Sequence, residues 1–412
     1  MFAVISSTDT RAVRRLFDRP AQRHVEVERQ VAAIVSEVRR RGDRAVREYA
    51  RRFDQLTGAL EVSREEILDG ASATPPKVRR ALKVAARHIR VVARRQVPRR
   101  CRVTVAPGVV VEQRVTPLSR VGCYVPGGRY PLPSSLLMTA IPARVAGVAD
   151  VVAVCPRLAP VVLAAALEAG VTRLFRIGGA HAVAALAYGT ASVPRVDKIV
   201  GPGNAYVAAA KALVSGDCAI DFRAGPSEIV ILAGAGTPEW IAADLVAQAE
   251  HDVDARAILL TWSRRLASQV QKCVHDQTPP DGPALQSLST NGGIVVTRTR
   301  QEAIELANRL APEHFVCEDD ATAAAVTQAG AVFVGPWTAQ ATGDYATGSN
   351  HVLPTNGAAR FRGGLSAADY VRVSAVQRLT ARGLRAIGPT AITLAEAEGL
   401  AAHARSIAIR LE

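Results

Sequence analysis

The chain lacks several features that would place it in a specialised class of protein. Its 412 residues contain no run of 18 apolar residues, so no segment is long enough to span a bilayer as a helix. The six cysteines form no C-x-x-C pair, which argues against a disulfide scaffold and against a zinc site made of cysteines alone. No basic segment followed by an apolar one opens the sequence, so we expect no secretory signal and a cytoplasmic location.

The composition is that of an ordinary globular protein. Hydrophobic residues make up 49% of the chain and charged residues 21%, which excludes a disordered polypeptide. A chain of this length is too long for a single hydrophobic core, so we predict two or three cores.

Positive charge is concentrated at one end of the chain. Residues 1–103 hold 25 of the 51 Lys and Arg but 12 of the 37 Asp and Glu, a balance of +13, whereas the remainder is close to neutral. Such asymmetry is found in nucleic-acid-binding proteins. However, apolar residues at helical spacing run through residues 31–53, and the interleaved aromatics or glycines of an RNA-binding surface are missing. We therefore interpret the arginines as the solvated face of helices and expect no nucleic-acid partner.

The order of apolar segments predicts an α/β fold. After a helical first hundred residues, strands are expected at 103–105 and 109–115, and short strands then alternate with helices from about residue 122 to 334. Strand–helix alternation with short connections predicts parallel, doubly wound sheets. We expect two Rossmann-like domains in tandem, with helical extensions at both ends. The expected strands are 151–154, 173–177, 198–200, 218–222, 229–232, 257–260, 293–296 and 315–317.

Potential metal ligands occur at helical spacing and around a polar loop. Gln248 and His251 lie three residues apart near the end of a predicted helix, so their side chains share one face. Asp344 and His351 bracket a loop rich in Gly, Ser and Thr, and His403 lies on the last predicted helix. An amide oxygen, a carboxylate and two or three imidazoles would suit zinc or another divalent metal. Each residue taken singly fits a purely structural role as well.

Two further patterns suggest chemistry. Glu313 and His314 are adjacent at a helix-to-strand junction, and adjacent side chains of an extended chain point apart, so we expect them to act on different atoms. The sequence has no G-x-G-x-x-G fingerprint. Its glycine loops, at 127–128 and 201–204, are weaker indications of a phosphate site.

Longer motifs carry a resemblance to a known family. They run in the order GCYVPGGRYPLPSSLLMTAIPARVAGV, GPGNAYV, DFRAGPSE, QAEHD, APEH, GDYATGSNHVLPT and AEAEGLAAH. This series resembles the histidinol dehydrogenases from about residue 25 to 410. The resemblance implies a zinc- and NAD-dependent four-electron oxidation of L-histidinol to L-histidine through histidinal, in histidine biosynthesis.

The resemblance also implies roles for individual residues. Glu313 and His314 would be the catalytic acid/base residues. Zinc, one per subunit, would be held by Gln248, His251, Asp344 and His403. NAD would contact Tyr124, His181 and Asn204, although position 181 is usually Gln in the family. The substrate contacts implied are Ser227, Gln248, His251, His314, Asp344, Glu398 and His403.

A domain plan follows from the same resemblance. We expect an N-terminal helical arm at 1–18, a first Rossmann-like domain from 19–121 and 230–365, and a second, on the cofactor side, at 122–229. A helical tail at 366–412 would reach the partner in a homodimer. Two alternatives remain: a related metal- and NAD-dependent dehydrogenase of another small amino alcohol or diol, and a non-catalytic relative that binds nucleic acid through its basic N-terminal helices.

Overall fold

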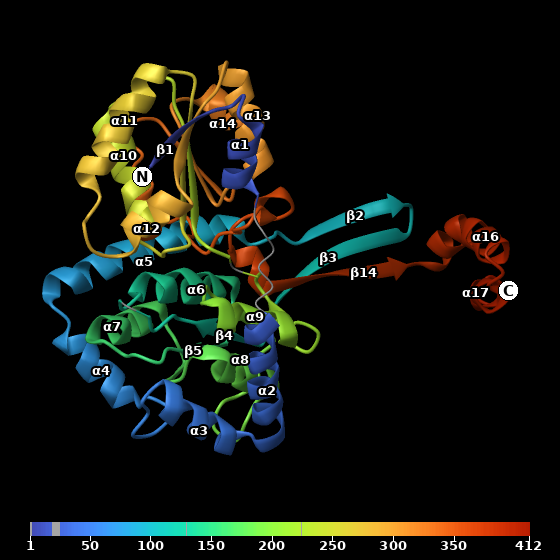
Figure 1. Cartoon of the computed structure of the whole chain (residues 1–412). Helices are drawn as coiled ribbons and strands as arrows, with labels where there is room; N and C mark the ends of the chain where they lie inside the picture. Colours follow the sequence, from blue (N-terminus) through green and yellow to red (C-terminus); the bar gives the residue numbers. More distant parts are fainter. Residues whose placement is uncertain (1, 19–24, 129, 224) are drawn as a thin grey trace.

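The chain forms two parallel β-sheets, each covered by helices, and an arm that projects from them (Figure 1). The computed structural model describes residues 2–18, 25–128, 130–223 and 225–412. This architecture confirms the predicted α/β fold with two doubly wound sheets in tandem. In the described part of the chain no helix is long and apolar enough to cross a membrane.

The larger sheet has six strands in the order β1-β11-β10-β9-β12-β13, and all neighbouring pairs are parallel. Ile229 and Ile231 join the core on one face, whereas Val230 and Leu232 join the core on the other. Burial on both faces explains why these strands read as continuous apolar runs. The strands are β1 (Ala3–Ser6), β9 (Glu228–Leu232), β10 (Arg256–Thr261), β11 (Gly293–Val296), β12 (His314–Cys317) and β13 (Ala331–Val334). The helices are α1 (Thr10–Phe17), α10 (Pro238–Ala249), α11 (Arg264–Gln277), α12 (Pro283–Thr290), α13 (Arg300–Leu310) and α14 (Asp320–Ala325).

The smaller sheet has five parallel strands in the order β6-β5-β4-β7-β8. Its first strand in the chain, β4, therefore lies in the middle, and the strand order reverses between β4 and β7. Ligands of open α/β sheets bind at such a reversal, outside the carboxyl ends of the strands. The strands are β4 (Arg120–Tyr124), β5 (Asp150–Val154), β6 (Arg173–Phe175), β7 (Lys198–Val200) and β8 (Ala219–Ile220). The connecting helices are α6 (Pro133–Ala146), α7 (Pro160–Ala169), α8 (Gly179–Tyr188) and α9 (Ala205–Val214).

The basic N-terminal helices cover the smaller sheet, which corrects the expected division of the chain. Val35 shares a buried cluster with Val183 and Val207 of α8 and α9, and Ile89 shares another with Leu136 of α6. The plan that joined residues 19–121 to 230–365 is therefore wrong for these helices, and residues 19–24 lie outside the described residues. An amphipathic pattern predicts that a face is buried, but not which sheet it covers. The helices are α2 (Val25–Arg41), α3 (Asp43–Phe53), α4 (Arg64–Ala73) and α5 (Pro76–Gln96).

The N-terminal segment is not a purely helical arm. Residues Ala3–Ser6 form β1, which pairs in parallel with Gly293–Val296 and closes one edge of the larger sheet. The expected helix is present as α1, and its Val13 and Leu16 pack into the core of that sheet. The strand was missed because four residues at a sheet edge carry little periodicity.

The C-terminal segment is likewise not helical throughout. Strand β14 (Val371–Leu379) pairs antiparallel with β3 (Val109–Pro117), which also pairs with β2 (Cys101–Ala106). This ribbon projects from the two sheets and carries α16 (Ala381–Ala397) and α17 (Ala401–Ala408) at its far end (Figure 1). The remaining short elements are α15 (Ala341–Tyr345) and the 3-10 turns η1 (Ala358–Arg360) and η2 (Ala367–Tyr370).

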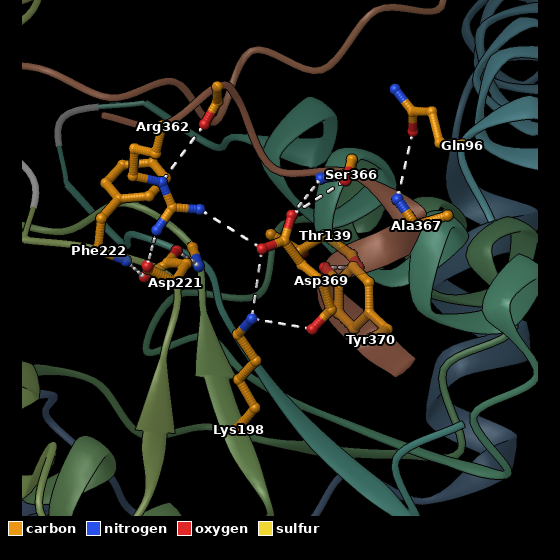
Figure 2. Close-up of polar contacts among 12 residues, drawn as sticks. Gln96, Thr139, Lys198, Asp221, Phe222, Arg362, Ser366, Ala367, Asp369 and Tyr370 are labelled. Atoms are coloured by element: carbon orange, nitrogen blue, oxygen red, sulfur yellow. Dashed lines mark hydrogen bonds and ion pairs between the residues drawn. The ribbon is translucent and has the colours of Figure 1, made fainter. Parts of the chain in front are cut away.

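Figure 2 shows how the root of this arm is fixed to the smaller sheet. Lys198 Nζ of β7 donates to the carbonyl oxygen of Asp369 at 2.8 Å, and Ser366 N donates to Asp369 Oδ2 at 2.9 Å. The Tyr370 hydroxyl, which is fully buried, donates to the carbonyl oxygen of Thr139 in α6 at 2.7 Å. The projecting ribbon therefore starts from a rigid base.

Candidate functional site

Glu313 and His314 converge on the backbone of one residue in the neighbouring strand. Glu313 Oε2 accepts a hydrogen bond from Glu228 N at 2.8 Å, and His314 Nδ1 lies 3.0 Å from the Glu228 carbonyl oxygen. His314 Nδ1 and Glu313 Oε2 are 3.6 Å apart, so the expectation that the two side chains point apart is wrong. Glu313 precedes β12, and strand alternation does not govern its side chain.

The hydrogen bond to a carbonyl oxygen fixes the role of each His314 nitrogen. A carbonyl only accepts, so Nδ1 carries the hydrogen and Nε2 is left with its lone pair. Nε2 is buried and has no partner among the described residues. Burial lowers the pKa of His314 to about 4, so the ring is neutral at physiological pH. The arrangement presents a proton acceptor to the site.

Burial also changes the acidity of Glu313. It raises the pKa of this carboxyl well above the ordinary value, and the charges of Glu228 and Asp344 act in the same direction. The Ser227 hydroxyl hydrogen-bonds to the Glu313 carboxyl, which puts this expected substrate contact at the same place. A carboxyl with a raised pKa is a stronger base once ionised.

Gln248, an expected zinc ligand, lies on α10 and is completely buried. Neither its Oε1 nor its Nε2 has a hydrogen-bond partner among the described residues. Leaving a buried amide unsatisfied costs about 1–3 kcal/mol, so such a group is expected to meet a ligand. His251 follows the end of the helix, with its backbone N donating to the Gln248 carbonyl oxygen at 3.3 Å.

Asp344 of α15 brings a carboxylate to the same region. Its Oδ1 lies 3.9 Å from His314 Nε2 and 4.0 Å from His351 Nδ1. Burial lowers the pKa of His351, and the charge of the nearby His251 adds to this effect. Electrostatic interactions with His314 place Asp344, His251 and His351 in one region.

His351, which the sequence offered as a potential metal ligand but to which the family resemblance gave no role, also lies at the site. Its Nδ1 lies 3.0 Å from the Asp344 carbonyl oxygen and therefore donates to it. The signal in the sequence was its place at the end of the same polar loop, opposite Asp344.

The residues present fit a zinc ion. In the described ranges no three His, Cys, Asp or Glu side chains lie close enough to hold a metal by themselves. However, the Gln248 amide is buried and without a hydrogen-bond partner among the described residues, and an amide oxygen, a carboxylate and an imidazole are all groups that can bind zinc. Gln248, His251 and Asp344 are three of the four zinc ligands that the family resemblance implies.

The remaining expected ligand lies elsewhere in this chain. His403 is an exposed residue of α17, and Glu398 is an exposed residue at the end of α16. Both therefore lie at the far end of the projecting arm, away from the sheets (Figure 1). The structure of one chain does not bring them to Gln248.

The three expected cofactor contacts lie around the smaller sheet. Tyr124 ends β4, and its hydroxyl accepts from Gly179 N at 2.9 Å. Asn204 caps α9 after β7, accepting from Val207 N at 3.2 Å, and is exposed. Tyr124 and Asn204 thus flank the reversal of strand order. The His181 side chain is 1% exposed and turns away toward α3, where its Nε2 lies 2.8 Å from Asp54 Oδ2.

A buried ion pair holds the loop between β7 and α9. Lys211 Nζ donates to the Gly201 carbonyl oxygen at 2.9 Å and to Asp221 Oδ1, while Asp221 Oδ2 accepts from Gly201 N at 2.7 Å. Gly201 has φ +112°, and a Cβ there would lie 2.2 Å from the Tyr124 carbonyl oxygen. Sequence reasoning missed Lys211 and Asp221; the available signal was a lysine inside an otherwise apolar helix.

Comparison with known proteins agrees with this geometry. The sequence model of the family described as histidinol dehydrogenase matches residues 17–411. A histidinol dehydrogenase from Bradyrhizobium diazoefficiens is 48% identical over 400 residues, covering 94% of this chain and 93% of that protein. One from Geobacter sulfurreducens is 46% identical over 402 residues, covering 94% of each. A crystal structure of histidinol dehydrogenase from Elizabethkingia anophelis matches with a TM-score of 0.94 at 32% identity, covering 100% of this chain and 98% of that one.

These matches extend over both sheets, the Glu313–His314 pair and the projecting tail. The chain belongs to the histidinol dehydrogenase family.

Proposed function

We propose that this protein is a cytoplasmic oxidoreductase that converts L-histidinol to L-histidine through histidinal, with NAD as hydride acceptor and one zinc ion per subunit. The observation that carries the proposal is the buried, neutral His314, whose Nε2 has no hydrogen-bond partner in the described part of the chain and faces Asp344 Oδ1 at 3.9 Å, while its Nδ1 lies 3.6 Å from Glu313 Oε2. A dehydrogenase of an alcohol needs a proton acceptor of this kind.

Gln248, His251 and Asp344 would hold the zinc ion, and His403 of a second chain would complete the set. When bound, zinc polarises the substrate oxygen and orients the substrate amine and imidazole. Ser227 lies at the same place, beside Glu313, and Glu398 on the tail offers a negative charge to the substrate ammonium.

His314 handles the proton of the first oxidation. Its Nε2 accepts the hydroxyl proton of the carbinol, and NAD, when bound, would take up the hydride. The alcohol thus loses two electrons and two protons, one proton to His314 and the other within the hydride. The Nδ1 hydrogen bond to Glu228 keeps the ring in the tautomer that can do this.

Glu313 serves the second oxidation. The aldehyde must take up water before a second hydride can leave, and a buried carboxylate beside His314 is suited to removing a proton from that water. The second hydride then leaves the hydrate, and the product is the carboxylate.

For NAD we propose the crevice at the carboxyl ends of β4 and β7. Tyr124 and Asn204 flank it, and the glycine loop fixed by Lys211 and Asp221 lies between them. His181 would affect NAD binding indirectly, through the start of α8, where Gly179 N donates to the Tyr124 hydroxyl.

The active unit proposed is a homodimer. The tail exposes Leu394, Leu400 and Ile409, which need a surface on which to be buried. A twofold dimer would let each tail deliver Glu398 and His403 to the other chain's site.

The test is the stoichiometry of the reaction. With zinc present, about two NADH should form per histidinol consumed and about one per histidinal supplied. A ratio near one with histidinol would indicate a two-electron dehydrogenase. Faster turnover of another amino alcohol or diol would favour the alternative substrate class.

A further inference from the structure

The two carboxylate oxygens of Asp344 have separate surroundings. Oδ2 accepts a hydrogen bond from Gln340 Nε2 at 3.1 Å. Oδ1 instead faces His314 Nε2 at 3.9 Å and His351 Nδ1 at 4.0 Å. The contact with Gln340 therefore restrains the rotation of the Asp344 carboxylate and leaves one oxygen facing the site.

Gln340 is itself held in place. It is 1% exposed, at the start of α15, so its side chain has little freedom. Its backbone N–H acts on the carboxyl of Asp244, a residue of α10, and favours the ionised form of that carboxyl. An electrostatic interaction thus links Asp244 to Gln340, and a hydrogen bond links Gln340 to Asp344.

The same helix presents Gln248. Asp244 and Gln248 are four residues apart on α10, so their side chains lie on one face, one turn apart. One helix therefore carries an expected zinc ligand directly and, through Gln340, orients a second ligand that comes from a distant part of the sequence.

We propose that Gln340 is a positioning residue for the metal site, anchored by Asp244, and that it aligns Asp344 Oδ1 with Gln248. Groups that hydrogen-bond to metal ligands fix their orientation, and their loss weakens metal binding about 10- to 100-fold. The inference rests on the proposed zinc site and adds to it two residues that do not touch the metal.

The test compares zinc affinities of full-length variants by competition with a chromogenic chelator. Gln340→Met keeps the side-chain length but removes the donor, and we expect zinc to bind about 10- to 100-fold more weakly. Its activity should recover at saturating zinc. The matched control is Gln271→Met, which removes a 2.8 Å hydrogen bond from a half-buried glutamine of α11 to the Phe2 carbonyl oxygen. Zinc affinity should be unchanged in this control.

Asp244 provides an independent second measurement. Asp244→Ala removes the acceptor for Gln340 N and should also weaken zinc binding, whereas Asp244→Asn keeps an acceptor oxygen and should retain it. Equal zinc affinity in wild type, Gln340→Met and Asp244→Ala would overturn the inference. The inference would also be overturned if the loss of zinc affinity were matched by a fall in the melting temperature of the metal-free variants. Failure of the wild type to bind zinc would instead contradict the proposed function.

Discussion

His181 Nε2 lies 2.8 Å from Asp54 Oδ2, in an interior contact that joins α8 to the residue ending α3. The side chains are 1% and 8% exposed. Asp54 Oδ2 also accepts from Gly178 N at 3.0 Å, and the rings of Tyr49 and Phe53 lie beside the imidazole. His181 is thus part of a network that holds the start of α8.

This contact leads to a prediction about cofactor binding. His181→Gln should preserve or strengthen NAD binding, since a glutamine amide can also donate to Asp54. His181→Ala should weaken NAD binding and lower the free energy of unfolding by about 1–3 kcal/mol, because it leaves a buried carboxylate short of a partner. Calorimetric titration with NAD and urea unfolding measure the two effects. A clear loss of affinity in His181→Gln would mean that the imidazole is a specific adaptation.

Glu313 and His314 should separate by reaction step. His314→Ala should slow oxidation of both histidinol and histidinal by roughly 100-fold or more, because both steps need a proton acceptor. Glu313→Gln should slow oxidation of supplied histidinal more than the first hydride transfer, since only the second step needs activated water. Single-turnover NADH formation with each substrate provides the measurement, and equal losses in both steps would contradict the assignment.

Removal of zinc should abolish oxidation without unfolding the protein. The expected ligands come from α10 and α15, and the core clusters of the larger sheet are complete without them. Gln248→Ala should likewise abolish oxidation without unfolding the protein. Circular dichroism before and after chelation tests this, and loss of the folded signal would show that the metal is structural.

Asp244 should make stability depend on pH. Burial raises the pKa of this carboxyl to about 6 from its ordinary 3.8. A pKa that is higher in the folded state contributes stability below the unfolded pKa, and this contribution is lost as pH rises through the folded value. The melting temperature of the metal-free wild type, relative to Asp244→Asn, should therefore fall between about pH 4 and pH 7. A constant difference over this range would show that Asp244 titrates normally.

Shared active sites can be tested by mixing inactive chains. After dissociation and reassociation, Glu313→Ala and His403→Ala chains should form mixed dimers in about half of all pairings. Each mixed dimer has one site with both defects and one with neither, so about a quarter of all sites should recover activity. If His403 served its own chain, every site would keep one defect and the mixture would stay inactive.

The sequence predicted the two sheets because buried parallel strands are continuous apolar runs. Residues 229–232 and 293–296 were expected as strands and form β9 and β11 almost to the residue. The sequence did not predict strands that are short or exposed: β1 has only four residues, and most of β14 is solvent-exposed. Helix patterns also could not assign α2 to a sheet, because an apolar face fits any complementary surface.

The site was predictable where local geometry sufficed. The polar loop pointed to Asp344, whereas His251 follows the end of α10, so helical spacing alone does not place its side chain relative to Gln248. The turn of Glu313 back toward Glu228 N depends on the packing of β12 beside β9. The hydrogen bond from Gln340 and the pair of Lys211 with Asp221 likewise arise from contacts that no local pattern encodes.

The projecting ribbon of β2, β3 and β14 separates His403 from the other expected ligands of its own chain. In the proposed dimer, zinc would therefore bind at a junction between two polypeptides, and metal loading and subunit association would be thermodynamically linked. Zinc would tighten the dimer by the same factor as dimerisation tightens zinc binding. Dilution of the enzyme should then release metal, and metal starvation should favour separate chains.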